Sequence, residues 1–153
     1  MFVHATCIDL AGAGVLIVGP SGSGKSDLAL RLVSAGAWLV SDDQCDLWVK
    51  DGLLWARAPQ RIDGLIEVRG VGILTAPRKS ATVLRLAVEL TAVPVPRLPE
   101  ARAWATPDAS WPRLPRLLLD GRDGSAPEKV RFMLAHLAQG TRGDRVVAGG
   151  LPD

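Results

Sequence analysis

The chain has 153 residues, of which 48% are hydrophobic and 22% charged, a balance typical of a folded protein rather than a disordered chain. With 18 basic and 16 acidic residues, its net charge of +2 does not favour nucleic-acid binding through bulk charge. It contains no apolar run near the ~20 residues that span a membrane, and no basic region of a signal peptide precedes its first apolar stretch, so we expect a cytoplasmic protein with no membrane partner.

The first forty residues predict strands around one helix. Residues 2–10 alternate loosely between apolar and polar side chains and predict a strand. Residues 15–18 (VLIV) predict a strand buried on both faces. A Gly/Ser loop at 19–24 then leads into a predicted helix at 25–35, and residues 38–40 (WLV) predict a further strand.

The rest of the chain predicts a hairpin, two strands and a second helix. Residues 47–55 contain an Asp-Gly turn between apolar runs, which is typical of a hairpin. Residues 83–90 alternate and predict a strand whose apolar face holds Leu84, Leu86, Val88 and Leu90. Six prolines at 94–115 indicate an irregular segment, residues 117–119 predict a last strand, and residues 129–138 predict a helix.

These elements predict one α/β domain over residues 1–140, with a mixed sheet and few helices. There is no repeat at a fixed period and no linker that would divide the chain. Residues 141–153 lack an apolar period, so we expect a flexible C-terminal tail. Cys7 and Cys45 are far apart in sequence and predict buried apolar packing rather than a disulfide framework or a zinc site.

The strongest motif is a glycine-rich loop that fits G-x-x-x-x-G-K-[ST] between a predicted strand and a predicted helix. Its glycines let several backbone N–H groups converge on one anion, and the helix adds the positive end of its dipole. The Lys25 ammonium suits phosphates, and the Ser26 hydroxyl suits Mg²⁺. The motif therefore predicts a nucleoside triphosphate site, although such loops also join strands to helices. The predicted nucleotide-binding residues are Gly19, Pro20, Ser21, Gly22, Ser23, Gly24, Lys25 and Ser26.

Asp42 and Asp43 directly follow the strand predicted at 38–40. Functional groups of an open α/β sheet gather at the carboxyl ends of its strands, so we expect this pair to fold against the glycine-rich loop. One carboxylate would hold a metal and the other would accept a proton from an attacking hydroxyl. The alternative is that the pair only caps a turn.

Glu67 and His4 are weaker candidates. Glu67 lies in a short strand or turn at 65–69, ahead of Gly70 and Gly72, where a solvated turn is the plain alternative. His4 stands alone in an apolar stretch, where a structural histidine is the plain alternative.

Taken in order, His4, GPSGSGKS at 19–26, LVSDD at 39–43 and EVRGVGIL at 67–74 resemble the catalytic domain of the HPr kinase/phosphorylase family. The EVRGVGI segment is the specific part of this resemblance, which is good over residues 1–90 and weak over 91–140. It implies a bacterial kinase that uses ATP and Mg²⁺ to phosphorylate a serine of HPr, a small phosphocarrier protein. Many members also remove that phosphate with inorganic phosphate. The family fold is a phosphate-loop core similar to the nucleotide site of phosphoenolpyruvate carboxykinase, and members are commonly hexamers.

The resemblance also implies residue roles. Asp42 matches the general base, and Lys25 matches the phosphate-binding lysine. Ser26 and Glu67 match the magnesium ligands, and our prediction adds Asp43 to the metal site.

Two further catalytic residues follow from the resemblance. His4 matches an active-site histidine, although Ala5 follows it where the family usually has glycine. Arg97 is aligned with a catalytic arginine that would stabilise the transferring phosphoryl group.

The chain also departs from the family. We expect no N-terminal regulatory domain, as in short forms of α-proteobacteria. Only Gly121 and Arg122 match the family's dephosphorylation loop, which puts the reverse reaction in question. A small-molecule kinase on the same core and a nucleotide-sensing module without turnover remain as alternatives.

Overall fold

The computed structural model describes residues 1–140, so the expected tail at 141–153 lies outside the described residues. Within this range the chain forms ten strands, two α-helices and one 3₁₀ turn, Gln60–Ile62. The strands are β1 (Phe2–Val3), β2 (Thr6–Leu10), β3 (Ala13–Val18), β4 (Trp38–Ser41), β5 (Cys45–Lys50), β6 (Leu53–Arg57), β7 (Leu65–Val68), β8 (Gly72–Thr75), β9 (Ala81–Leu90) and β10 (Arg116–Leu119). The helices are α1 (Lys25–Ser34) and α2 (Ala126–Gly140).

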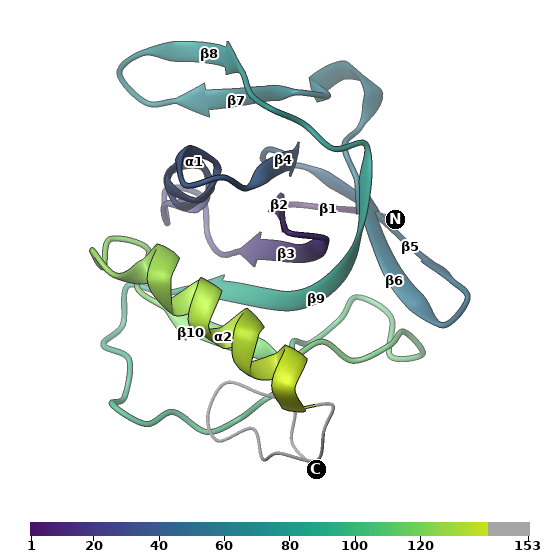
Figure 1. Ribbon diagram of the computed structural model, residues 1–153, viewed down its shortest axis with the longest axis vertical. Coiled ribbons are helices and arrows are strands. Elements are labelled where there is room, and N and C mark those ends of the chain that lie inside the picture. The colour runs from purple at the N-terminus through teal and green to yellow at the C-terminus, as the bar shows by residue number, and fades with distance from the viewer. Residues whose placement is uncertain (141–153) are drawn as a thin grey trace.

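Eight strands form one curled mixed sheet in the order β1-β5-β6-β9-β3-β2-β4, with β10 added beside β9. The long strand β9 bends through the molecule (Figure 1). Its first residues pair with β6, and its later residues pair in parallel with β3 and β10. The predicted mixed α/β fold with few helices is thus confirmed.

The strand directions bring several loops to one edge of the sheet. Strand β2 is antiparallel to both β3 and β4, so β3 and β4 run in the same direction. Because β9 is parallel to β3 and β10 to β9, all four strands end at that edge. The loops that follow β3, β4 and β10 therefore start from neighbouring positions.

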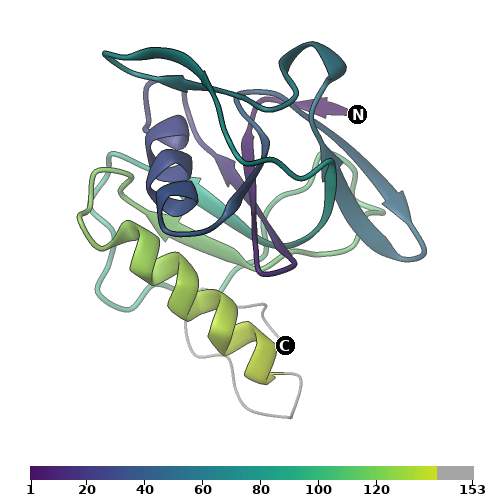
Figure 2. The same cartoon turned by 45° about the horizontal axis from the view of Figure 1, so that its top comes forward.

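Two apolar clusters fill the two faces of the sheet. Both helices lie on one side of the molecule (Figure 2), where Leu28, Leu32 and Val130 pack against β3 and β9. The other cluster lies under the β5–β6 hairpin and includes both cysteines, which are fully buried as expected.

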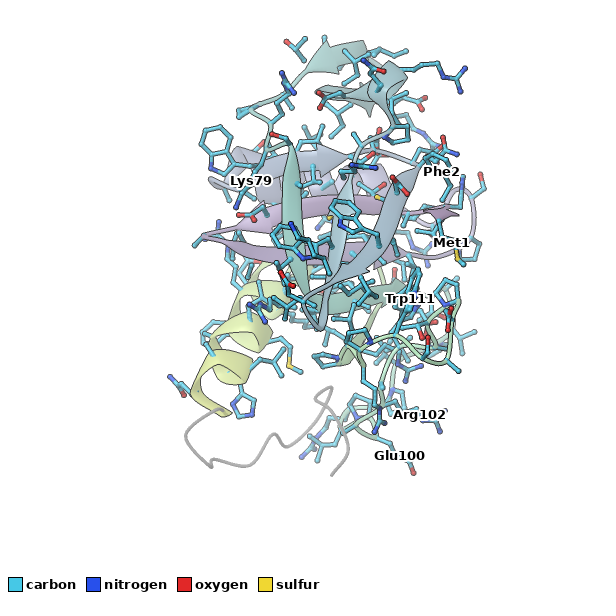
Figure 3. All side chains as sticks on the ribbon, turned by 90° about the vertical axis from the view of Figure 1, so that its right-hand side faces the viewer. Met1, Phe2, Lys79, Glu100, Arg102 and Trp111 are labelled. Carbon is cyan, nitrogen blue, oxygen red and sulfur yellow. The ribbon has the colours of Figure 1, made fainter. Side chains whose placement is uncertain are left out.

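The proline-rich segment forms neither a helix nor a named strand, as predicted, and its only regular pairing is the bridge between Ala103 and Pro115. Trp104 and Trp111 from this segment pack against the cluster under the hairpin. Glu100 and Arg102 form an exposed ion pair at 3.2 Å, at the end of the molecule opposite β7 and β8 (Figure 3).

The structure corrects two sequence predictions. The single strand predicted at 2–10 is broken at His4, because β1 pairs with β5 whereas β2 pairs with β3 and β4. Leu84 faces the cluster under the hairpin, since the pairing of β9 with β3 shifts between Leu84 and Leu86. Helix α2 contains the whole of the helix predicted at 129–138. No helix among the described residues is long and apolar enough to cross a membrane.

Candidate active site

The glycine-rich loop connects β3 to α1, and its conformation depends on glycine. Gly22 and Gly24 have φ angles of 79° and 99°, in the left-handed region that other residues rarely adopt. A Cβ on Gly19 would lie 2.7 Å from Ser23 Oγ and 3.1 Å from the carbonyl oxygen of Leu90. The loop therefore has the tight backbone that the motif predicts.

Lys25 starts α1 and turns back over the loop. Its ammonium donates to the carbonyl oxygens of Gly19 at 2.8 Å and Pro20 at 3.0 Å, and the residue is 6% exposed. A buried cation is stable only where polar groups surround it, and here the loop backbone supplies them. The loop thus holds a positive charge at its own centre.

Asp42 is buried and accepts hydrogen bonds on both carboxylate oxygens. Oδ1 accepts from the hydroxyl of Ser26 at 2.6 Å and from the hydroxyl of Thr6 at 3.1 Å. Oδ2 accepts from the backbone N–H of Glu67 at 3.0 Å. One carboxylate thereby joins β2, α1, β4 and β7, and the expected contact between the acidic pair and the glycine-rich loop is confirmed.

Asp43 differs from its neighbour in exposure and direction. Its φ of 66° lies in the left-handed region, which Asp tolerates better than most residues, and its side chain is 68% exposed. Asp43 Oδ1 lies 3.3 Å from Nε2 of His4, and the backbone N–H of Asp43 donates to the hydroxyl of Thr6 at 3.1 Å. The turn after β4 thus buries one carboxylate and presents the other beside His4.

A pocket of about 610 Å³ lies at the carboxyl edge of the sheet, and Lys25, Ser26 and Asp43 line it, whereas Asp42 and His4 do not. The loop and the start of α1 form one wall, and Glu67, Val68 and Arg69 from the β7–β8 hairpin form another. The lining residues are Ser21, Gly22, Ser23, Gly24, Lys25, Ser26, Asp27, Leu30, Asp43, Glu67, Val68, Arg69, Gly121 and Arg122.

The pocket fits a nucleotide phosphate chain with Mg²⁺. Ser23 Oγ is buried within the loop without a hydrogen-bond partner, so the loop retains an unused polar group. The oxygens of Ser26, Asp43 and Glu67 are the type of ligand that Mg²⁺ prefers. No group of three His, Cys, Asp or Glu side chains forms a metal cage within residues 1–140. Mg²⁺ in phosphoryl-transfer sites usually needs only one or two carboxylates, because phosphates and water supply its other ligands.

The structure does not bring Arg97 to this pocket. Arg97 lines a second pocket of about 480 Å³, together with Leu118, Phe132 and Met133. The chain that follows β9 passes over β10 and α2, so its arginine lies on that side of the fold.

Two polar residues of the site were given no role from the sequence. Thr6 looked like an ordinary strand residue, and only the pairing of β2 with β4 places its hydroxyl at Asp42. Arg69 is separated from Glu67 by Val68, and the β7–β8 hairpin places both charged residues in the pocket wall. Arg122, by contrast, could be expected near the site, because Gly121 and Arg122 match the family's dephosphorylation loop.

Fold and site together define a mixed α/β protein with a glycine-rich loop and an acidic pair at one end of its sheet. The family described as HPr Serine kinase C-terminal domain matches residues 1–91. This match covers more than half of the chain, which therefore belongs to that family.

Curated relatives agree with this assignment. The chain is 49% identical to the HPr kinase/phosphorylase of Streptococcus thermophilus over 73 residues, which are 47% of this chain. It is 46% identical over 72 residues to the HPr kinase/phosphorylase of Clostridium beijerinckii. The aligned part is 24% of the length of each relative, so the match spans about a quarter of either protein.

A solved structure shares the whole fold. The Hpr(Ser) kinase/phosphatase from Coxiella burnetii superposes with a TM-score of 0.79 over 94% of this chain and 93% of the other, at 24% sequence identity. The fold similarity thus includes the segment after residue 91, which the family match does not cover.

Proposed function

We propose that this protein is a kinase that uses Mg²⁺·ATP to phosphorylate a serine hydroxyl of an HPr-type phosphocarrier protein. The observation that carries the proposal is the 2.6 Å hydrogen bond from Ser26 to Asp42, which joins the phosphate loop to the acidic pair. The names of the relatives supply the acceptor protein. The expected cytoplasmic location belongs to this proposal, because ATP is available there.

The chain's own residues bind and orient the reactants. Backbone N–H groups of the loop and the Lys25 ammonium would hold the phosphates, while Ser26, Glu67 and an aspartate would hold the metal. When bound, Mg²⁺·ATP supplies the phosphoryl group and neutralises its charge. The serine oxygen would form a bond to the γ-phosphorus as the bond to the leaving ADP oxygen breaks. The protein contributes mainly position and electrostatics, because the transition state is loose.

The geometry favours a division of labour opposite to the one predicted from the sequence, which made Asp42 the base and Asp43 a metal ligand. Asp42 is buried and bonded to the Ser26 hydroxyl, the position of a carboxylate that organises the metal. Asp43 lines the pocket and is exposed, so an incoming hydroxyl can reach it. We therefore assign proton acceptance to Asp43. His4 lies 3.3 Å from Asp43 and would orient it.

The reverse reaction and the assembly stay predictions from the family resemblance. Gly121 and Arg122 line the pocket, so an arginine is available there for inorganic phosphate. A hexamer would be consistent with the family. The reverse reaction and the hexamer are properties of full-length family members, and this chain aligns with about a quarter of the length of such a relative.

The proposal is tested by incubating the protein with γ-labelled ATP, Mg²⁺ and an HPr-type protein from the same source. We expect label on a serine of the HPr-type protein, and loss of that label when inorganic phosphate is added in excess if the reverse reaction is retained. Label on a metabolite instead would indicate the small-molecule kinase. Tight ATP binding without transfer to any acceptor would indicate the nucleotide-sensing module.

A further inference from the structure

Arg31 lies on α1, nearly two turns after the phosphate loop, and joins that helix to the loop between β10 and α2. Its Nη1 donates to the carbonyl oxygen of Asp123 at 3.0 Å, and its Nη2 donates to the carbonyl oxygen of Gly121. Its Nε lies 3.2 Å from Oδ2 of Asp27 on the same helix. A planar guanidinium can donate to two separated acceptors at once, which a lysine ammonium on a flexible chain does less well.

The residues that Arg31 holds pack directly on the phosphate loop. A Cβ on Gly121 would lie 2.7 Å from the carbonyl oxygen of Ser23 and 3.1 Å from Cδ1 of Leu90. Gly121 therefore contacts the phosphate loop through its backbone alone. The loop at 120–124 has phosphate-loop backbone on one side and the Arg31 guanidinium on another.

The same loop presents Arg122 to the pocket. Arg122 lines the pocket and is 77% exposed, and its side chain lies 3.3 Å from Oδ1 of Asp120. Its backbone N–H also donates to Asp120 at 2.9 Å. No hydrogen bond or ion pair within the described chain joins the Arg122 guanidinium to the phosphate loop, so its place in the pocket depends on the loop backbone that carries it.

We infer that Arg31 is a positioning residue that clamps the loop at 120–124 against the phosphate loop and so places Arg122 over the bound phosphates. The part concerning phosphates rests on the proposed nucleotide site, whereas the clamp itself does not. Arg31 touches neither reactant in this arrangement. In this inference, its effect on nucleotide binding passes through Arg122 rather than through the phosphate loop that Gly121 contacts.

The test is a double-mutant cycle on the full chain with Arg31→Lys and Arg122→Ala, measuring ADP affinity in Mg²⁺ by calorimetry. We expect Arg31→Lys to weaken ADP binding about tenfold in the wild-type background and to have almost no effect when Arg122 is already alanine. Equal losses in both backgrounds would overturn the inference, since Arg31 would then act independently of Arg122.

Amide hydrogen exchange gives a readout that does not require a nucleotide. We expect Arg31→Lys to speed exchange at 120–124 at least tenfold and to leave β3 and β9 unchanged. The matched control is Arg131→Lys, because Arg131 on α2 likewise donates to a backbone carbonyl, that of Ala35, but does not bond the loop at 120–124. Unchanged exchange at 120–124 in Arg31→Lys would refute the clamp even if the nucleotide site is correct. If the wild type binds no ADP but the exchange difference is present, the proposed function fails while the clamp stands.

Discussion

Asp42 is the residue at which the site is assembled, because its carboxylate accepts from Ser26, Thr6 and Glu67. Each donor comes from a different segment, so a carboxylate at this point fixes their relative positions. Asp43, one residue later, bonds the same Thr6 through its backbone N–H. Thr6 therefore links the backbone of one aspartate to the side chain of the other.

Replacing Thr6 by valine keeps its shape and removes the hydroxyl that bonds both aspartates. Because the site is buried, the loss should cost about 1–2 kcal/mol of unfolding free energy. We expect kcat for phosphate transfer to fall about tenfold with little change in KM for ATP, since Asp43 loses its orientation. Thr6→Ser should restore kcat. A Thr6→Val enzyme with unchanged kcat would show that this hydroxyl serves stability alone.

Asparagine substitutions separate the two aspartates. We expect Asp43→Asn to lower kcat about 10³-fold while Mg²⁺·ADP binds nearly as well as to the wild type, because only proton acceptance is lost. Asp42→Asn should weaken Mg²⁺·ADP binding, because it disturbs Ser26. The measurements are single-turnover transfer rates and calorimetric affinities in Mg²⁺. The opposite pattern would restore Asp42 as the base.

At the scale of elements, the site exists because β3, β4 and β10 end at one edge of the sheet. The phosphate loop, the acidic pair and the loop at 120–124 each follow one of these strands. The β7–β8 hairpin adds Glu67 and Arg69 from outside the main sheet. Gly121 lies against the phosphate loop without room for a side chain.

Gly121→Ala tests this approach directly. The added Cβ would meet the Ser23 carbonyl oxygen at 2.7 Å, and backbone cannot yield as a flexible side chain can. We expect a lower melting temperature and at least tenfold weaker ADP binding. Gly124→Ala is the matched control in the same loop, because a Cβ there meets nothing within 4 Å. Similar effects of both substitutions would contradict a specific contact at Gly121.

At the scale of the whole molecule, a buried carboxylate ties β2 to the start of β9. Asp9 accepts from the hydroxyl of Thr82 at 2.6 Å, from the Lys79 ammonium at 2.9 Å and from the N–H of Gly12 at 2.8 Å. Burial by itself raises the pKa of Asp9, but these hydrogen bonds outweigh it and hold the pKa below its ordinary value of 3.8. The charged carboxylate is therefore the form that stabilises the fold.

Acidification should remove the stability that the charged Asp9 carboxylate gives to the fold. Because the folded pKa lies below the unfolded one, the stabilisation is complete above about pH 4 and is lost as the pH falls through the folded value. We expect Asp9→Asn to lower the unfolding free energy by about 2 kcal/mol at neutral pH. The difference from the wild type should shrink in strong acid, as followed by urea denaturation at several pH values. A difference that does not change with pH would show that the charge of Asp9 is not what matters.

Local pattern determined much of what the sequence could show. The apolar run at 15–18, the glycine-rich loop and the helix after it are set by neighbouring residues, since turn geometry and helix periodicity act over a few positions. The resemblance of residues 1–90 to a kinase family rests on the same motifs, and the family match at 1–91 agrees with it. The contact between the glycine-rich loop and the acidic pair was also predicted, because functional groups of an open α/β sheet lie at the carboxyl ends of its strands.

Tertiary structure alone decided which carboxylate is buried, which residues hold it and where each arginine lies. Thr6 reaches Asp42 only because β2 pairs with β4, and Leu84 changes face only because β9 shifts its register against β3. Arg97 and Arg122 lie in different pockets. The segment after β9 carries Arg97 over β10 and α2, whereas β10 itself ends at the edge of the site, where the loop with Arg122 begins. Such contacts join residues far apart in the chain, and their strength depends on burial and direction, which no local pattern of residue types specifies.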